Sequence, residues 1–548
     1  MKHRSIKKET ILLFAIIILA DFLRFYNLNW DEGHYFQPDE RNIANAVSKI
    51  DFLNQLNPQF FAYGGFTIYL NKAVANILTF FTHDPSWGTD WAKINLIGRT
   101  LSASFSTITI IPLYLLSKKI FGQKVAIVAS LIYALTVASI QAAHFGTTES
   151  LLTLFVTTLT LLSFRIFENP KLDNYLLTAI IFGLAVATKT TSLIFAIFPL
   201  MATFLVIIQR RVVIAKILLS VFVFGLTSFI VFTIFSPYTF LSWDKFWESM
   251  TYESGVASGS LPVVYTLQFN HTLPYLFQIT NFFWQLGPMA IFTILGIVVL
   301  LKSLLKRESP QLLLFLSFPI IYFTYVGTWH AKFIRYMIPI IPFLIIFASY
   351  ILVRLQGRFS TWGRIFVAGV LILTGVWALA FFSIYTREQT RISASIWIYQ
   401  HIPPGSYILQ EHWDDGLPLP LEKFSPDLYR TEQLTIYEPD NRDKLEYYSK
   451  KLSQADYIAI SSRRLYGTLI NLPEKYPLTS KYYRLLFEGS LGYSKVAEFS
   501  SYPSFLGLEI NDDSSEESFQ VFDHPKVLIF QNIEHFGKEH YLNLLGYE

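Results

Sequence analysis

The segment 29–41, Asn-Trp-Asp-Glu-Gly-His-Tyr-Phe-Gln-Pro-Asp-Glu-Arg, contains two Asp-Glu pairs, a histidine and an arginine directly after the first long apolar stretch of the chain. Carboxylates at a membrane boundary are costly if they enter hydrocarbon and useful if they face a polar cleft at the water interface. In such a cleft a carboxylate can accept a proton from a reacting group. We interpret the segment as the catalytic loop of a membrane enzyme; the alternative is a solvated acidic loop that happens to follow a membrane span.

The composition predicts the class of protein that holds this loop. The chain has 548 residues, of which 52% are hydrophobic, 17% aromatic and only 15% charged. Such values are typical of a polytopic membrane protein. The chain has no cysteine, which excludes disulfides, Cys-ligated zinc and thiol nucleophiles. Its net charge of +4 is small and scattered, so no nucleic-acid partner is expected.

Apolar stretches that are candidates to cross a membrane recur along residues 1–385. The first, residues 10–26, follows Lys2, Arg4, Lys7 and Lys8 and is expected to act as a signal anchor, because its charged end offers no small-residue cleavage site. The others are Ile94–Leu116, Val125–Ala142, Leu151–Phe167, Tyr175–Ala187, Ser192–Ile208, Ile217–Phe235, Ala290–Leu304, Leu312–Val326, Met337–Val353 and Ile365–Ile384. Together they predict about eleven transmembrane helices.

Residues 66–83 are also apolar, but polar residues interrupt them, so they could form a further span or a helix in the membrane surface. We expect the surface helix, because a further crossing would move the Lys118–Lys124 cluster and every later basic loop to the outside. The N-terminus is then cytoplasmic, in the plasma (inner) membrane. The acidic loop, the long loop 236–287 and the residues after 385 are then extracytoplasmic.

After residue 385 the composition changes to that of a soluble domain. An amphipathic helix pattern covers Ile392–Gln400, and strand-like runs occur at Tyr407–Leu409, Tyr457–Ile460 and Val527–Phe530. The predicted fold is therefore an α-helical polytopic domain over 1–385, whose catalytic first outer loop is about 28–93, followed by an extracytoplasmic α/β domain over 386–548. Roughly 160 residues suffice for an independent core.

Several short motifs occur in a fixed order along the membrane part. They are Pro38-Asp39-Glu40-Arg41, Arg99, the turn from His144 to Glu149, Gly183-Leu184-Ala185 with Lys189, the segment 281–288 ending in Trp-x-x-Gly-Pro, and Lys332-x-x-Arg335-Tyr336-x-x-Pro339-x-x-Pro342. In this order they resemble the polyprenyl-phosphate-sugar-dependent glycosyltransferases of the GT-C fold. The branch in question contains the protein O-mannosyltransferases and the lipid A aminoarabinose transferases, although the segment 61–65 lacks the lysine of the aminoarabinose branch.

The resemblance implies transfer of one sugar from a dolichyl- or undecaprenyl-phosphate carrier to an acceptor hydroxyl on the extracytoplasmic side. Asp39 then corresponds to the catalytic carboxylate and Glu40 to its neighbour in the site. Glu149 lies where many members have an aspartate. The residues that the resemblance assigns to substrate binding are Arg41, His144, Lys189, Lys332, Arg335 and Tyr336.

These residue types suit the implied reaction. A carboxylate such as Asp39 can take the proton of an acceptor hydroxyl as it attacks the anomeric carbon. The leaving phosphate needs charge stabilisation more than protonation, and Arg335 with Lys332 could supply it. Each residue also has a simpler interpretation: Arg335 and Lys332 as anchors in the headgroup layer, and Glu149 as an acid in the first turn of a helix. Asp31 and Glu32 are expected on a polar rim.

The expected partners are a polyprenyl-phosphate-linked sugar donor, an acceptor that is a protein, lipid or glycan, and the lipid bilayer. No cofactor is expected. A divalent metal ion held by the four loop carboxylates is the alternative, since hard cations prefer oxygen ligands. Two other classes of protein remain open: a secondary transporter, which would place polar groups near mid-membrane, and a lipid-binding envelope scaffold without catalysis.

Overall fold

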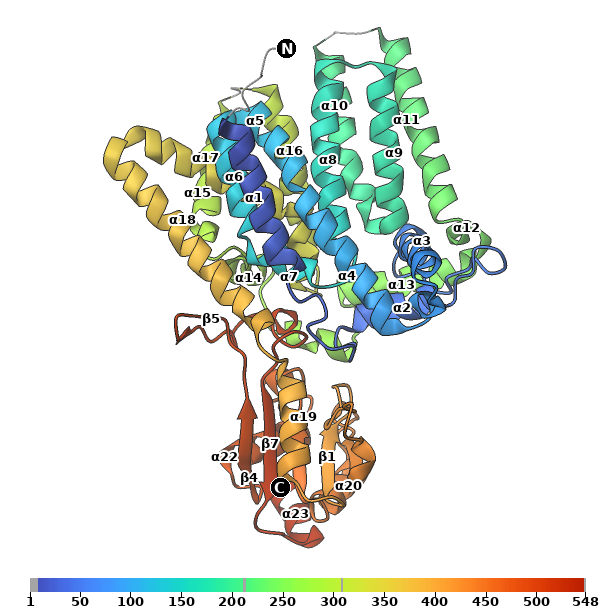
Figure 1. Cartoon of the computed structure of the whole chain (residues 1–548), viewed down its shortest axis with the longest axis vertical. Helices are drawn as coiled ribbons and strands as arrows, with labels where there is room; N and C mark the ends of the chain where they lie inside the picture. Colours follow the sequence, from blue (N-terminus) through green and yellow to red (C-terminus); the bar gives the residue numbers. More distant parts are fainter. Residues whose placement is uncertain (1–7, 210–212, 307–308, 547–548) are drawn as a thin grey trace. The chain divides into compact units, whose positions relative to one another are not determined.

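The computed structural model describes residues 8–209, 213–306 and 309–546, and it divides into two compact units (Figure 1). The first unit comprises Met1–Leu261 and His271–Phe382, and the second Pro262–Asn270 and Ser383–Glu548. The second unit therefore includes residues 262–270 of the long loop 236–287, although the sequence analysis assigned that whole loop to the first domain, 1–385. The basic residues Lys2, Arg4 and Lys7 lie outside the described residues.

Each predicted transmembrane stretch coincides with helical structure in the first unit. The helices are α1 (Lys8–Phe25), α4 (Trp91–Ile108), α5 (Ile110–Phe121), α6 (Gln123–Ala134), α7 (Val137–Ala143), α8 (Glu149–Glu168), α9 (Leu172–Thr188), α10 (Ile197–Ile208), α11 (Ile214–Phe235), α15 (Met289–Leu305), α16 (Pro310–Val326), α17 (Ile341–Arg358) and α18 (Ser360–Phe382). By length and composition, six helical runs of the described chain can span a membrane, and the pair α6 and α7, bent by 52°, makes a seventh. Three shorter apolar helices are α9, α15 and α16. The predicted polytopic helical fold is confirmed, while the count of eleven spans stays a prediction.

Shorter elements join these helices at the ends where the predicted outer loops lie. They are α2 (Pro38–Ser48), α3 (Gly65–Thr82), α12 (Tyr238–Leu241), α13 (Trp243–Ser258), α14 (Leu276–Leu286) and the 3-10 helices η2 (Thr190–Ala196) and η4 (Ile334–Ile340). The helix α3 corresponds to the predicted surface helix. Its C-terminal half exposes Ile77, Phe80 and Phe81, whereas the face that it buries contains Asn71 and Lys72 as well as Ile68 and Ala75. Its position relative to the membrane stays a prediction.

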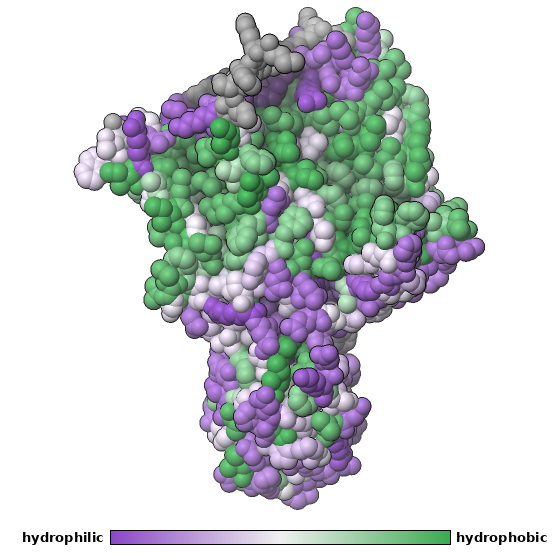
Figure 2. Space-filling view, in the orientation of Figure 1, coloured by the Kyte–Doolittle hydropathy of each residue, from purple (hydrophilic) through white to green (hydrophobic). Residues whose placement is uncertain are grey.

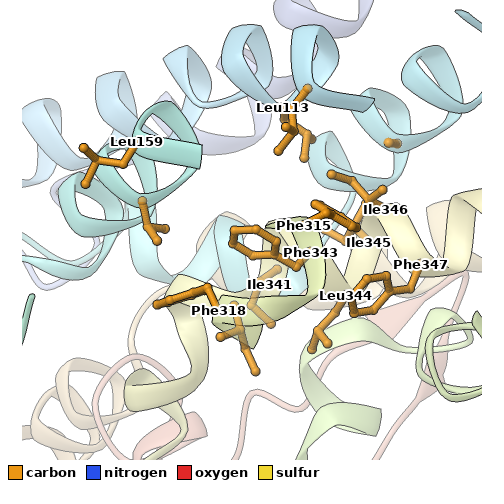
Figure 3. Close-up of a cluster of buried hydrophobic side chains, with 14 of the residues drawn as sticks. Leu113, Leu159, Phe315, Phe318, Ile341, Phe343, Leu344, Ile345, Ile346 and Phe347 are labelled. Carbon is orange, nitrogen blue, oxygen red and sulfur yellow. The ribbon is translucent and has the colours of Figure 1, made fainter. Parts of the chain in front are cut away.

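Packing between α5, α8, α16 and α17 forms the interior of the first unit. Leu113 of α5, Leu159 of α8 and Phe315 of α16 are fully buried, and they belong to the same apolar cluster as the side chains of α17 (Figure 3). The rings of Phe315 and Phe343 lie 5.6 Å apart. Aromatic pairs at this spacing add stability beyond the apolar area that they bury. This interior fixes the helices whose ends carry the site residues.

The outer surface of the first unit is unusually apolar. On the face shown in Figure 2, hydrophobic side chains cover most of the helices and polar side chains gather near the helix ends. Examples with more than half of their surface exposed are Phe14 of α1, Phe222 of α11 and Ile372 of α18. A soluble protein rarely exposes so large an apolar surface. Contact with lipid explains it.

The second unit is an α/β domain, as predicted. Its five-stranded sheet has the order β2-β1-β3-β7-β4, formed by β1 (Tyr407–Glu411), β2 (Arg430–Leu434), β3 (Tyr457–Ile460), β4 (Tyr493–Phe499) and β7 (Val527–Asn532). The strands β2, β1 and β3 are parallel, whereas β7 is antiparallel to both of its neighbours. The helices α20 (Arg442–Leu452), α22 (Pro477–Glu488) and α23 (Lys538–Leu545) share one core with the sheet, and α19 (Thr390–His401) contacts β4 and β7.

Candidate active site

The Asp39-Glu40 pair lies in the first turn of α2. Gln37 caps this helix, since its side-chain oxygen accepts a hydrogen bond of 2.9 Å from the backbone N–H of Glu40, and Pro38 occupies the first helical position. Proline and acidic residues both favour a helix N-terminus. Successive residues of a helix point about 100° apart. The two carboxylates therefore leave the helix in different directions and reach different partners.

Glu40 belongs to a buried network centred on Arg99 of α4. Arg99 Nε and Nη2 donate to the Glu40 carboxylate at 2.8 and 2.6 Å, and Nη1 and Nη2 donate to Asp31 at 2.8 and 2.7 Å. Nη1 also donates to the carbonyl of Leu28 at 2.9 Å. All five N–H bonds of the guanidinium are thus used. The three charged side chains are at most 2% exposed, so the expectation that Asp31 lies on a polar rim is wrong.

The two acids of this network differ in their pKa. Burial raises the pKa of Asp31, but the charge and hydrogen bonds of Arg99 and the N–H groups of Gly33 and Tyr35 outweigh it, so the pKa is lowered. Burial raises the pKa of Glu40 by more than Arg99 lowers it, and the charge of Asp31 adds to the rise. One arginine therefore serves two acids and favours ionisation of Asp31. The network fastens the first loop to α4 and, through the N–H of Gly146, which donates to Glu40 at 2.6 Å, to the turn before α8.

Asp39 lies in a second, more open cluster. Its carboxylate forms an ion pair with Arg335 of η4, and the two side chains are 18% and 28% exposed. The guanidinium also lies 5.7 Å from the centre of the Tyr336 ring. Unlike Arg99, Arg335 keeps a buried Nε that has no hydrogen-bond partner among the described residues. We call Asp39, Arg335, Tyr336, Tyr63, Glu149 and Lys189 the Asp39 cluster.

Lys189 and Glu149 form the other half of this cluster. Lys189 follows the last residue of α9, and its Nζ lies 3.8 Å from Glu149 Oε1, 5.0 Å from the Tyr63 ring centre and 5.8 Å from that of Tyr336. Glu149 is the first residue of α8 and is buried, yet its Oε2 has no hydrogen-bond partner in the part of the chain that the structure describes. A buried polar atom of this kind is rare in folded proteins and usually has a functional or solvent-related reason.

Two glycines hold Tyr63 beside Lys189. The N–H of Gly64 donates to the carbonyl of Thr188 at 2.9 Å, and the N–H of Gly65 donates to Ser236 Oγ at 3.1 Å. A Cβ at Gly64 would lie 2.0 Å from the carbonyl oxygen of Ala187, and one at Gly65 would lie 2.7 Å from that of Phe235. No larger residue fits either position. The pair therefore joins the ends of α9 and α11 and lines a small pocket with Thr190 and Tyr238.

Comparison with known proteins supports the predicted resemblance. Residues 95–243, which include Arg99, His144, Glu149 and Lys189, match the family described as dolichyl-phosphate-mannose-protein mannosyltransferase. The chain is also similar to the archaeal oligosaccharyltransferase AglB of Archaeoglobus fulgidus in complex with an inhibitory peptide and a dolichol-phosphate, with 13% identity and a TM-score of 0.55 over 92% of this chain and 75% of that one. No curated protein matches the chain.

The chain has the GT-C fold. A further similar structure is ArnT of Cupriavidus metallidurans bound to undecaprenyl phosphate, at 14% identity and a TM-score of 0.47 over 95% of this chain and 97% of that one. At 13% identity, the likeness to AglB establishes the fold alone. The family match over residues 95–243 and the shared fold support the predicted membrane glycosyltransferase class.

The GT-C fold does not bring every predicted site residue to the Asp39 cluster. His144 is fully buried, and its two ring nitrogens lie 2.8 and 2.9 Å from the carbonyl oxygens of Ile140 and Tyr26, so it joins α7 to the loop after α1. Lys332 is buried, and its Nζ donates to the carbonyl of His330 at 3.0 Å; burial lowers its pKa. Arg41 is half-buried on α2.

The structure adds two residues that the sequence analysis missed, Tyr63 and Glu253. Burial and the charge of Asp39 raise the pKa of the Tyr63 hydroxyl well above its usual value, although Arg335 opposes them. Glu253 of α13 lies one turn before Ala257, whose carbonyl accepts the N–H groups of His330 and Ala331 at 2.9 and 3.2 Å. The pKa of Glu253 is raised, because desolvation by the surrounding protein outweighs the charges of Lys189 and Arg335, which lower it. The Gly64-Gly65 pair after Tyr63 was a sequence signal that could have identified Tyr63. No sequence signal pointed to Glu253.

Metal binding is the remaining question about the site. Across the described ranges of the chain, no group of three or more His, Asp or Glu side chains is arranged to hold a metal ion. Asp39 and Glu40, which the alternative would use together, point to different arginines. Asp39 is therefore directed away from Asp31 and Glu40, which both pair with Arg99.

Proposed function

We propose that the protein transfers a single sugar from a polyprenyl-phosphate carrier to an acceptor hydroxyl. The reaction takes place on the extracytoplasmic face of the plasma (inner) membrane, with the N-terminus in the cytoplasm. The acceptor is a protein, lipid or glycan. The family match over residues 95–243 and the shared fold support the lipid-linked donor, and the geometry of the Asp39 cluster supports the chemistry.

One observation carries the proposal: the Asp39 cluster contains polar atoms that the protein itself does not use. Within residues 8–209, 213–306 and 309–546, Arg335 Nε and Glu149 Oε2 are buried without hydrogen-bond partners, although both belong to charged groups. Leaving such groups unpaired is costly, so a ligand that pairs with both would bind favourably. A phosphate suits the guanidinium, and a sugar hydroxyl suits the carboxylate oxygen.

Asp39 acts as the general base in this mechanism. The acceptor oxygen attacks the anomeric carbon, the bond from that carbon to the phosphate oxygen breaks, and the acceptor proton passes to the Asp39 carboxylate. A single displacement of this kind inverts the anomeric configuration. Before the donor binds, Asp39 is paired with Arg335. Transfer of the arginine to the donor phosphate frees the carboxylate for the acceptor.

Arg335 and Lys189 stabilise the departing polyprenyl phosphate. Negative charge develops on the phosphate oxygens as the bond to the sugar breaks, and fixed cations in a partly buried site stabilise that charge in the transition state. Lys189 replaces Lys332 in this role, because its Nζ lies within the cluster, 3.8 Å from Glu149, whereas Lys332 Nζ donates to its own loop. Glu149 and Tyr63 bind hydroxyl groups of the sugar.

The test is release of free polyprenyl phosphate from a panel of polyprenyl-phosphate sugars by protein reconstituted in lipid. Wild type should release it from one donor in the presence of acceptor extract. Asp39→Asn should lower the rate by about 10²–10⁴-fold. Glu32→Gln is the matched control, because Glu32 is an exposed acid of the same loop that lies outside the cluster, and it should leave the rate unchanged.

Two results would contradict the proposal. Absence of release with every donor and acceptor extract would favour a transporter or a lipid-binding scaffold. Equal rates for wild type and Asp39→Asn, in protein that retains its thermal stability, would remove Asp39 from the role of base and leave the donor assignment intact. Loss of activity on chelation, restored by a divalent ion, would show that a metal takes part.

A further inference from the structure

The second unit carries a small hairpin with an exposed apolar tip. Its strands are β5 (Ser504–Phe505) and β6 (Leu508–Glu509), labelled at β5 in Figure 1. Leu506 and Leu508 are 88% and 76% exposed, more than any other large hydrophobic side chain among the described residues of this unit. Ile510, just beyond the hairpin, is also exposed. The hairpin leaves the sheet directly after β4.

The backbone of the turn is unfavourable for the residue that it presents. Leu506 and Gly507 form the two central positions, with φ of 51° and 82°. Turns of this type strongly favour Asn-Gly, because positive φ strains most residues with a Cβ, whereas the short polar side chain of asparagine can compensate by local hydrogen bonding. Leucine at the first position therefore departs from the residue preference of this turn. Because the exposed Leu506 side chain gains little packing inside the fold, the departure indicates a function outside it.

The base of the hairpin is fastened to the point where the chain leaves its last apolar helix. The N–H of Ser504 donates to Ser383 Oγ at 3.1 Å. Arg387 donates to Ser504 Oγ and, at 3.1 Å, to the carbonyl of Tyr502. Ser383 directly follows Phe382, the last residue of α18. The hairpin is thus hydrogen-bonded to Ser383, and one peptide bond joins Ser383 to the end of α18.

This connection places the tip within reach of the bilayer. The helix α18 has 23 residues, which is about 34 Å at 1.5 Å per residue and slightly more than the hydrocarbon thickness of about 30 Å. Phe382 therefore lies near the boundary of the hydrocarbon. Leu506 is two residues beyond Ser504, or about 7 Å along a strand. The headgroup layer is roughly 5–8 Å deep.

We propose that the tip of the hairpin, Leu506 and Leu508, inserts into the lipid surface of the leaflet from which α18 emerges. The occupant of this apolar surface is phospholipid, because the hairpin is hydrogen-bonded to the first residue after a lipid-exposed helix. Arg387 lies at the base of the hairpin, where a cation can attract lipid phosphates. The hairpin then ties the second unit to the membrane at a second point besides the chain itself.

Spin labels on single cysteines test the proposal, since the chain has no native cysteine. Leu506→Cys and Leu508→Cys are labelled in full-length protein in phosphatidylcholine vesicles, and collision with oxygen is compared with collision with a water-soluble nickel chelate. Ile372→Cys, exposed on α18, is the lipid reference. Ile533→Cys is the water reference: it is exposed and follows the end of β7 that is remote from the hairpin, since Val527 pairs with Phe499 and Asn532 with Tyr493.

The expected result is an oxygen-to-nickel ratio at 506 and 508 several-fold above that at 533 and close to that at 372. In the double variant L506S/L508S, a label at Ile510→Cys should become more accessible to nickel than in the parent. A ratio at 506 equal to that at 533 would overturn the proposal. Low collision of the label with both reagents would also overturn the proposal, because the tip would then be covered by protein. Dipolar broadening of the label spectrum would show that the tip contacts a second copy of the chain, and its absence would show that the tip packs against the same chain.

Discussion

Asp39 and Glu40 are neighbours in sequence, but they belong to two regions of opposite character. Glu40 enters the Arg99 network, in which every N–H of the guanidinium is used and the charged side chains are buried. Asp39 enters the Asp39 cluster, where Arg335 and Glu149 each keep an unused polar atom. Both regions place a carboxylate against an arginine. They differ in how completely the protein satisfies the charges.

This difference separates structural from chemical use of the same residue types. A saturated, buried ion network has nothing left to offer a ligand, and breaking it exposes uncompensated charge to the protein interior. In an incompletely satisfied cluster, the unpaired buried atoms lower the stability of the fold, and a ligand that pairs with them gains that free energy on binding. We therefore expect substitutions in the Arg99 network to lower stability and substitutions in the Asp39 cluster to lower activity.

The largest effect is expected from Arg99→Met. This change leaves Asp31 and Glu40 buried without their cation, which typically costs about 3–5 kcal/mol. The first loop and the turn at Gly146 lose their common anchor, since Glu40 also accepts the Gly146 N–H. The yield of monodisperse protein after heating, measured by size-exclusion chromatography, should fall strongly. Wild-type thermal stability in this variant would contradict the structural role of Arg99.

Arg335→Met should show the opposite pattern. Loss of a fixed cation at a developing negative charge typically lowers kcat by about 10²–10³-fold. Asp39 is partly exposed and can be hydrated when its partner is removed, so thermal stability should change little. The measurement is polyprenyl phosphate release together with the heating assay. A large loss of stability with normal turnover in the remaining folded protein would place Arg335 among the structural residues instead.

Glu40→Gln separates the two acids directly. The amide is isosteric and can still accept hydrogen bonds, but it removes the charge that faces Arg99, at an expected cost of about 1–3 kcal/mol in the free energy of unfolding. Turnover per folded molecule should stay near that of wild type. The matched comparison is Asp39→Asn, which makes the same chemical change one residue earlier. A loss of turnover in Glu40→Gln as deep as in Asp39→Asn would show that Glu40 takes part in the chemistry.

The division between the two regions was only partly predictable from the sequence. The Pro-Asp-Glu-Arg motif located the acids, and the hydropathy pattern located the helices that carry them. Which acid faces which arginine depends on the direction in which each leaves α2 and on partners up to 296 residues away. Local patterns contain no such information. His144 matched a motif, but in the structure its two ring nitrogens each lie within 3 Å of a backbone carbonyl oxygen, away from the Asp39 cluster.

The second unit shows the same limit in its sheet. The sequence predicted β1, β3 and β7, which lie in the middle of the sheet and are rich in buried apolar residues. It missed β2 and β4, which are the two edge strands and are largely exposed. Edge strands carry polar and charged residues that protect them from pairing with other chains. The polar and charged residues that suit β2 and β4 to the edge therefore remove the apolar pattern by which a strand is predicted from sequence.

Lys332→Gln should have the smallest effect. The Lys332 Nζ is buried against the carbonyl of His330, and burial lowers its pKa, so the residue suits a role in shaping its loop rather than in binding the phosphate. The amide can keep one hydrogen bond, and turnover should fall by less than about tenfold, the equivalent of 1.4 kcal/mol. Lys189→Gln, a matched change of a lysine within the Asp39 cluster, should cost more. If Lys332→Gln lowers turnover more than Lys189→Gln does, the phosphate lies nearer Lys332, and Lys332 belongs to the residues that bind the donor.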